Sequence, residues 1–226
     1  MKILVRGSKD RRQEVQEKFS GTDNLITSLG YDEEIQENLN SYNLIFDLNL
    51  DEFPEKLDEY LNYEGILVVS ALRIQLAALV QNKSLKCQLI GMNCLSGFIN
   101  KPEVEISLLE PGHRDFVEEV FKQLNWKPRI CADRVGLVTS RILFMIINEA
   151  CYTLQEGTAG LKDIDTAMKL GTNYPGGPFE WADRIGIKHV YEILEAVYQD
   201  THDERYKICP LLKTHYLKGL TFYSIA

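Results

Sequence analysis

The segment from Lys162 to Gly186, KDIDTAMKLGTNYPGGPFEWADRIG, most constrains how this chain can fold. It begins as a helix, because Asp163 and Asp165 can cap free N–H groups and Gly171 supplies a left-handed residue at its end. The following YPGGP stretch cannot continue a helix, because it combines two prolines with two glycines. Pro178 then suits the first position of a second helix. The segment therefore predicts a helical hairpin around a Gly/Pro-rich loop.

Composition and charge exclude several classes of protein. The chain has 226 residues, of which 45% are hydrophobic and 26% charged, as in ordinary globular proteins of one large or two modest domains. Its net charge of -8 argues against nucleic acid or an anionic membrane as a main partner. The sequence contains no apolar run of the roughly 20 residues that span a bilayer, and the start MKILVRGSKDRR is too short in apolar residues for a signal peptide.

The cysteines and histidines predict no metal site. The five cysteines form no C-x-x-C pair, and the four histidines lack the spacing of metal ligands. We therefore expect free thiols and a cytoplasmic protein.

The first half of the chain alternates apolar runs with helical stretches. The runs are Met1–Gly7, Asn24–Leu29, Asn43–Leu50, Gly65–Leu72, Gln88–Asn93 and Glu103–Leu109. The helical stretches are Ser8–Phe19, Asp32–Leu39, Pro54–Leu61, Ile74–Gln81 and His113–Leu124. This order predicts an α/β fold, a Rossmann-like doubly wound parallel sheet over residues 1–132. A long apolar helix, Val135–Glu156, then opens an all-α domain over residues 133–226.

The helical hairpin closely resembles the signature of the C-terminal domain of the 3-hydroxyacyl-CoA dehydrogenase family. The matching residues are Asp163, Asp165, Gly171, Tyr174, Pro175, Gly177, Pro178, Phe179, Glu180, Asp183 and Gly186. The resemblance implies a Rossmann-like domain that binds NAD, a helical domain that forms a homodimer, and an acyl-CoA substrate. The implied reaction is NAD-dependent oxidation of a 3-hydroxyacyl-CoA, of a short chain such as 3-hydroxybutyryl-CoA.

The glycine fingerprint that should follow the first strand is incomplete. Only Gly7 matches it, because Lys9 stands at the second glycine position and Arg12 at the third. The acidic ribose-binding residue is also missing from the end of the second run, Thr27–Leu29. We therefore expect normal NAD binding at this turn to be impaired. Two interpretations stay open: Lys9, Arg11 and Arg12 form a solvated basic face, or they hold a phosphate in another pose.

The resemblance also locates the catalytic positions. Asn93, in GMNCLSG, stands where the family has its catalytic histidine, and Glu105 stands twelve residues on, where the family has the glutamate that orients it. Ser140 replaces the family's substrate-binding asparagine, and Ser70 is a remnant of its serine segment. An amide does not titrate near neutral pH, so Asn93 cannot serve as the base. Glu105 is then either a substitute base or a strand-end carboxylate without a catalytic task.

These observations leave three functional hypotheses. The first is a dehydrogenase of the family with impaired activity. The second is a catalytically degenerate subunit that binds acyl-CoA or another protein. The third is an enzyme with a changed reaction, in which Glu105 or Ser70 participates.

Overall fold

The structure, a computed structural model, describes residues 1–223 and divides into two compact units, one from Met1 to Leu137 and one that begins at Val138. The sequence prediction set the domain boundary between residues 132 and 133. In the structure residues 133–137 belong to the first unit. There the Asp133 carboxylate accepts the backbone N–H groups of Leu76 and Ala77, which fixes the segment after the last strand to the start of α2 (Leu76–Leu79).

The first unit is built on one mixed sheet. Within the described residues its strands are β1 (Lys2–Gly7), β2 (Leu25–Gly30), β3 (Leu44–Asp47), β4 (Ile66–Ser70), β5 (Gln88–Met92), β6 (Glu103–Leu108) and β7 (Lys127–Cys131). Their order in the sheet is β2-β1-β3-β4-β5-β6-β7, and all neighbours pair in parallel except β5 and β6. The strand order reverses at β1, which places the topological switch point between β1 and β3.

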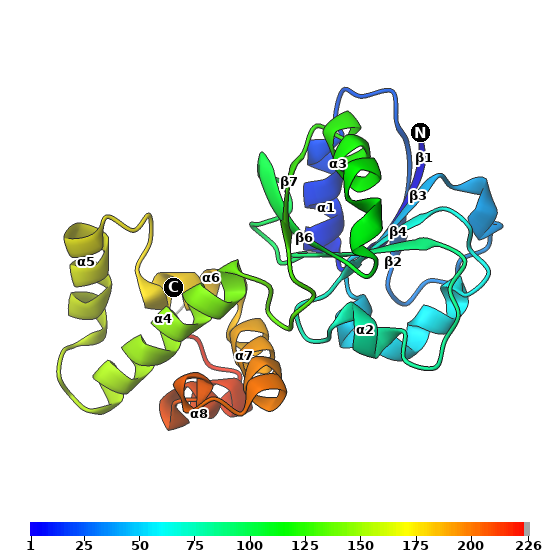
Figure 1. Ribbon diagram of the computed structural model, residues 1–226. Helices are drawn as coiled ribbons and strands as arrows, with labels where there is room; N and C mark the ends of the chain where they lie inside the picture. Colours follow the sequence, from blue (N-terminus) through cyan, green and yellow to red (C-terminus); the bar gives the residue numbers. More distant parts are fainter. Residues whose placement is uncertain (224–226) are drawn as a thin grey trace. The chain divides into compact units, whose positions relative to one another are not determined.

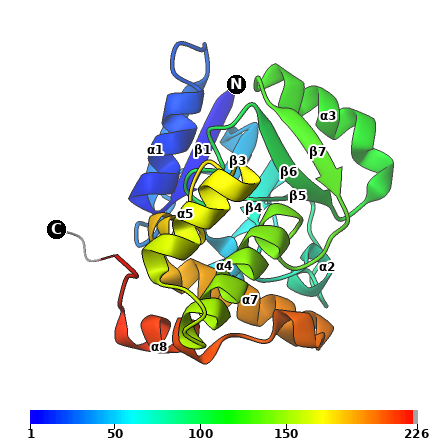
Figure 2. The ribbon, with the colours of Figure 1, turned by 90° about the vertical axis from the view of Figure 1, so that its left-hand side faces the viewer.

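Helices cover both faces of the sheet, which confirms the predicted doubly wound α/β architecture (Figure 1). One face packs against α1 (Lys9–Lys18) and α3 (Arg114–Gln123) through a core that includes Val15, Phe46 and Phe121. The other face packs against short helical turns. These are η1 (Leu39–Ser41), η2 (Leu50–Glu52), η3 (Pro54–Tyr60) and α2 (Leu76–Leu79), while η4 (Pro111–His113) leads into α3. Helix α3 also lies along edge strand β7 (Figure 2).

The prediction of a helix over Asp32–Leu39 is wrong, because this stretch is a loop up to the short η1. Glu33, Glu34 and Glu37 would repel one another on a helix, and Glu37 instead pairs with Lys2 at 2.7 Å. The predicted helix Ile74–Gln81 is shorter than expected, because α2 is a single turn. The predicted helix Pro54–Leu61 is a 3₁₀ helix, η3, rather than an α-helix.

The sheet differs from a wholly parallel one in its last strands. Strand β6 runs antiparallel to β5, since the segment 93–102 between them contains no crossover helix. Strand β7 was not predicted, because Lys127, Pro128 and Arg129 interrupt the apolar pattern of an edge strand.

The second unit is all helical, as predicted. Its helices in the described residues are α4 (Thr139–Gln155), α5 (Leu161–Thr172), α6 (Pro178–Ile185), α7 (Ile187–Thr201), η5 (Glu204–Tyr206) and α8 (Pro210–Lys218). Helix α4 contacts α6, α7 and α8, which explains its broad apolar surface. The expectation that Gly171 ends the first helix of the hairpin is wrong, because α5 continues to Thr172 and Asn173 takes the left-handed conformation (φ 58°).

The acidic residues of the hairpin hold the helices together. Asp165 lies within α5 rather than at its start, and its buried carboxylate accepts the N–H groups of Phe179 (2.9 Å) and Glu180 (3.2 Å). It therefore caps α6, not α5 as the sequence suggested. Glu180 accepts the Gly177 N–H at 3.0 Å, which closes a capping box. Asp183 accepts the N–H groups of Phe222 and Tyr223, both at 2.8 Å. These residues of the signature thus have structural tasks.

Candidate functional site

The carboxyl ends of the parallel strands define the place where a ligand would bind. Gly7, Asp47, Ser70 and Met92 end β1, β3, β4 and β5, and in open α/β sheets ligands occupy the crevice beyond such ends. Three of the residues predicted from the sequence, Gly7, Ser70 and Asn93, lie at these ends.

Asn93 and Glu105 come together because β6 returns antiparallel beside β5. The register pairs Met92 with Ile106, and the Asn93 N–H donates to the Glu105 carbonyl at 3.1 Å. Asn93 Nδ2 lies 3.5 Å from Glu105 Oε2, while its Oδ1 accepts the Leu95 N–H at 3.3 Å. The amide is 4% exposed. Both of its polar atoms thus face groups of the protein, and neither can take a proton from a substrate near neutral pH.

Two predicted hydroxyls are buried without a hydrogen-bond partner. Ser70, at the end of β4, is 1% exposed and Ser140, in the first turn of α4, is 2% exposed. Within residues 1–223 neither Oγ makes a hydrogen bond. An unpaired buried hydroxyl is costly, and such groups often mark a site that a ligand or water completes.

The turn after β1 is occupied by the loop that follows β3. A Cβ on Gly7 would lie 2.9 Å from the Cβ of Leu48 and 3.1 Å from Oδ1 of Asn49, so glycine is needed here for internal packing. The Ser8 N–H donates to the same Asn49 oxygen at 2.8 Å. A dinucleotide needs free N–H groups here and no side chain at the second position. Because Lys9 stands there, the residues present do not fit NAD in that pose.

The end of the second strand differs from the sequence prediction. Strand β2 continues to Gly30, beyond the Thr27–Leu29 run, so acidic residues do follow it closely, as Asp32 and Glu33. A Cβ on Gly30 would meet the Glu33 carboxylate at 2.8 Å. The strand end was thus placed one residue too early, while the prediction that the acidic ribose-binding residue is missing stays a prediction.

A buried carboxylate at the end of β3 was not singled out from the sequence. Asp47 Oδ2 accepts the Tyr60 hydroxyl at 2.8 Å, and Arg6 ion-pairs with Glu59 at 2.6 Å beside it. Burial raises the pKa of Asp47 to about 6, although the Tyr60 hydrogen bond and the Arg6 charge lower it. The available signal was an acidic residue inside the apolar run Asn43–Leu50.

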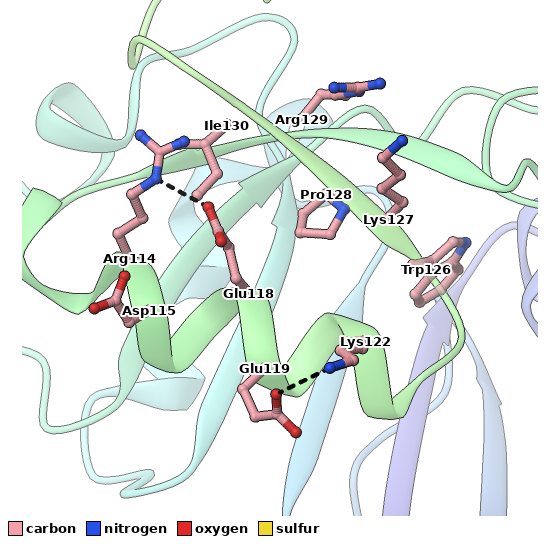
Figure 3. A pocket seen from close by; sticks show the side chains of 10 residues that line it. All are labelled: Arg114, Asp115, Glu118, Glu119, Lys122, Trp126, Lys127, Pro128, Arg129 and Ile130. Atoms are coloured by element: carbon pink, nitrogen blue, oxygen red, sulfur yellow. Dashed lines mark hydrogen bonds and ion pairs between the residues drawn. The ribbon is translucent and has the colours of Figure 1, made fainter.

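A surface hollow of about 670 Å³ lies between α3 and β7 (Figure 3). Its lining is mostly charged, and the charges pair with one another, as Arg114 does with Glu118 at 2.9 Å and Lys122 with Glu119 at 4.0 Å. It contains none of the residues predicted for the site. We interpret it as a hydrated surface feature.

Residues 1–223 also bear on metal binding, membrane insertion and thiol chemistry. This part of the chain brings together no group of three His, Cys, Asp or Glu side chains that could hold a metal ion. None of its helices is long and apolar enough to cross a membrane. Burial raises the pKa of the Cys87 and Cys131 thiols to about 11, which disfavours their thiolate forms near neutral pH.

Comparison with known proteins identifies relatives of both units. Residues 136–221 match the family model of the 3-hydroxyacyl-CoA dehydrogenase C-terminal domain. A probable 3-hydroxybutyryl-CoA dehydrogenase of Deinococcus radiodurans is 33% identical over 173 residues, which are 74% of this chain and 61% of that protein. The 3-hydroxybutyryl-CoA dehydrogenase of Clostridioides difficile is 30% identical over 185 residues, or 78% of this chain and 66% of the relative. The chain thus spans slightly less than two thirds of these relatives.

Among solved structures, the (S)-3-hydroxybutyryl-CoA dehydrogenase of Ralstonia eutropha has the same fold. It superposes with a TM-score of 0.75 at 20% identity, over 96% of this chain and 94% of that one.

Proposed function

We propose, because this chain belongs to the 3-hydroxyacyl-CoA dehydrogenase family, that it binds short-chain acyl-CoA thioesters of the 3-hydroxybutyryl-CoA type and that its NAD-dependent dehydrogenation is impaired. The observation that carries the proposal is Asn93. It stands where the resemblance implies a histidine, with its amide turned onto Glu105 and the Leu95 N–H. Loss of a positioned base typically slows a reaction by about 10²–10⁴-fold.

Substrate binding is supported by the part of the chain that matches the family model, residues 136–221. The helical unit carries the family match, and Ser70 and Ser140 each keep a buried hydroxyl without a partner in the described residues. A buried hydroxyl without a partner can donate a hydrogen bond to the carbonyl oxygen of a thioester. Within the first unit we give this role to Ser70, and Glu105 is the group that holds the Asn93 amide.

The second candidate function is a catalytically silent subunit that binds acyl-CoA or a protein partner. The observation that favours it is the turn at Gly7, which Asn49 fills and which does not fit a dinucleotide in the family's pose. In this case the chain needs neither a base nor a cofactor.

The proposal includes a homodimer in the cytoplasm. Large apolar side chains on the helical unit are exposed, among them Ile142 at 57%, Leu170 at 82% and Leu217 at 69%, as expected for a surface that a second copy covers. Free cysteines suit a reducing compartment. Light scattering of the purified chain measures its mass in solution, and a monomer at micromolar concentration contradicts the dimer.

The experiment measures NADH and NADPH consumption with acetoacetyl-CoA, together with acetoacetyl-CoA binding by calorimetry. We expect saturable binding and consumption close to the uncatalysed background. Asn93→His restores a base and Asn93→Gln is its matched control, because glutamine keeps the amide. Turnover gained by the histidine variant alone assigns the impairment to Asn93. Binding without turnover in every variant favours the silent subunit. Absence of binding refutes the first proposal and leaves of the second only a subunit that binds a protein partner.

A further inference from the structure

The turn after β1 is part of a closed ring of polar contacts. Asn49 Oδ1 accepts the Ser8 N–H at 2.8 Å, and its Nδ2 donates to Glu52 Oε1 at 2.9 Å. Arg11, in the first turns of α1, ion-pairs with the same Glu52 oxygen at 2.9 Å and donates to the carbonyl of Leu48. The ring thus links β1, α1 and the loop after β3. A side-chain amide suits the place of Asn49, because it accepts at one end and donates at the other.

The ring is buried, which makes it a fixed part of the fold. Arg11 is 2% exposed and Asn49 is 6% exposed, and the Glu52 side chain is 11% exposed. Breaking a buried ion pair is strongly destabilising, because the remaining charge loses its partner. A ligand that displaced Asn49 or Arg11 would have to compensate for that loss.

Two of the three basic residues of the turn are partly engaged within the protein. Arg11 is buried against Glu52, and Arg12 donates to the Ser28 hydroxyl of β2 at 2.9 Å. Lys9 is exposed on the first turn of α1. Arg11 Nη2 and Arg12 Nε have no hydrogen-bond partner in the described residues, but both groups are buried, so the alternative that these three residues together hold a phosphate in another pose requires the two arginines to rearrange.

We infer that Asn49 occupies the turn after β1 in place of a dinucleotide phosphate, and that the Arg11–Glu52 ion pair fixes Asn49 in this position. The first unit then completes its fold without NAD(H). The Asn49 oxygen takes the N–H that a phosphate oxygen would otherwise accept at the start of the helix. The inference concerns this turn alone and goes beyond the proposed binding of acyl-CoA.

The direct test titrates the unmodified full chain with NADH and NADPH, followed by nucleotide fluorescence and by the melting temperature. We expect no saturable binding up to millimolar nucleotide and no change in melting temperature. Ligands that bind only the folded state raise the melting temperature as their concentration exceeds the dissociation constant. Micromolar binding with a rise of several degrees overturns the inference.

A second test asks whether Asn49 caps the turn. Amide hydrogen exchange at Ser8, read by NMR, should be at least about tenfold faster in Asn49→Ala, because the protecting acceptor is gone. Asn49→Asp keeps that acceptor and should retain the protection, although it places a carboxylate beside Glu52. Asn62→Ala, at an exposed asparagine, is the matched control. Unchanged Ser8 exchange in Asn49→Ala, or lost protection in Asn49→Asp, contradicts the cap. Should the alanine variant not fold, the aspartate variant and the titration decide.

Failure of this inference is distinguishable from failure of the proposed function. Acetoacetyl-CoA binding is measured on the same sample by calorimetry. Acetoacetyl-CoA bound with no nucleotide bound supports the inference, whereas nucleotide bound with high affinity overturns it whatever the thioester does.

Discussion

The buried carboxylate of Asp165 offers the sharpest test of how the helical unit is held together. Besides the N–H groups of Phe179 and Glu180, it accepts the Tyr223 hydroxyl at 2.7 Å. Partial burial and this hydrogen bond hold the pKa of Tyr223 above its usual range, so the phenol remains the donor. One side chain therefore joins α5, the start of α6 and the segment that follows α8.

Asp165→Ala removes the two carboxylate oxygens and with them all three hydrogen bonds. Loss of a helix cap costs about 0.5–2 kcal/mol, and a hydrogen bond to a charged group contributes about 1.5–3 kcal/mol. Since such values are not additive and water can reach some donors, we expect the free energy of unfolding to fall by about 3–5 kcal/mol. Asp165→Asn keeps one acceptor oxygen and should cost about 2 kcal/mol, and Tyr223→Phe about 1 kcal/mol.

Urea unfolding of the full chain, followed by far-UV circular dichroism, measures these differences. Asp163→Ala is the matched control, because this exposed acid in the first turn of α5 should change stability by less than about 0.5 kcal/mol. The double variant of Asp165→Asn and Tyr223→Phe should cost less than the sum of its parts, since the two groups share a bond. An Asp165→Ala variant as stable as Asp163→Ala would refute the reasoning.

Two further predictions concern single residues. Gly177→Ala should unfold the helical unit or destabilise it by several kcal/mol, because the new Cβ would meet the side chain of Asp165. Gly171→Ala is the control, because a Cβ there has open space around it, and this substitution should be neutral or slightly stabilising. Thermal melts of both variants measure the difference. Asp47 has its pKa raised by burial from an ordinary 3.8 to about 6, so the folded state binds the extra proton between these values. The stability of the unmodified chain relative to Asp47→Asn should therefore fall by about 2 kcal/mol as pH rises from 4 to 6, and a pH-independent difference contradicts this.

The contact between Asn93 and Glu105 is one that spacing along the sequence could predict. The resemblance placed the two residues twelve positions apart, and the structure brings their side chains to 3.5 Å. Spacing suffices here because β5 and β6 are neighbours in the chain and pair antiparallel, so the offset along the chain sets the contact.

The ring around Asn49 could not be found in the same way. Ser8 and Asn49 are 41 residues apart, and Arg11 and Leu48 are 37 apart. Such contacts depend on β3 lying beside β1, which is a property of the sheet order rather than of local pattern. The incomplete glycine fingerprint indicated that the turn had changed, but not what had replaced the open site.

The sequence by itself determined the two-unit architecture and the position of the helical hairpin. Apolar periodicity and Gly/Pro punctuation are local signals, and they suffice to place most strands and helices. Tertiary structure alone decided that Asp165 caps α6, that β6 turns antiparallel, and that Asn49 fills the turn beside Gly7. The two contacts of Asp165 and Asn49 depend on which buried polar group finds a partner across the fold, because a buried donor or acceptor must be satisfied wherever the chain brings one within reach. The direction of β6 depends on the connection before it, which is too short for a crossover helix.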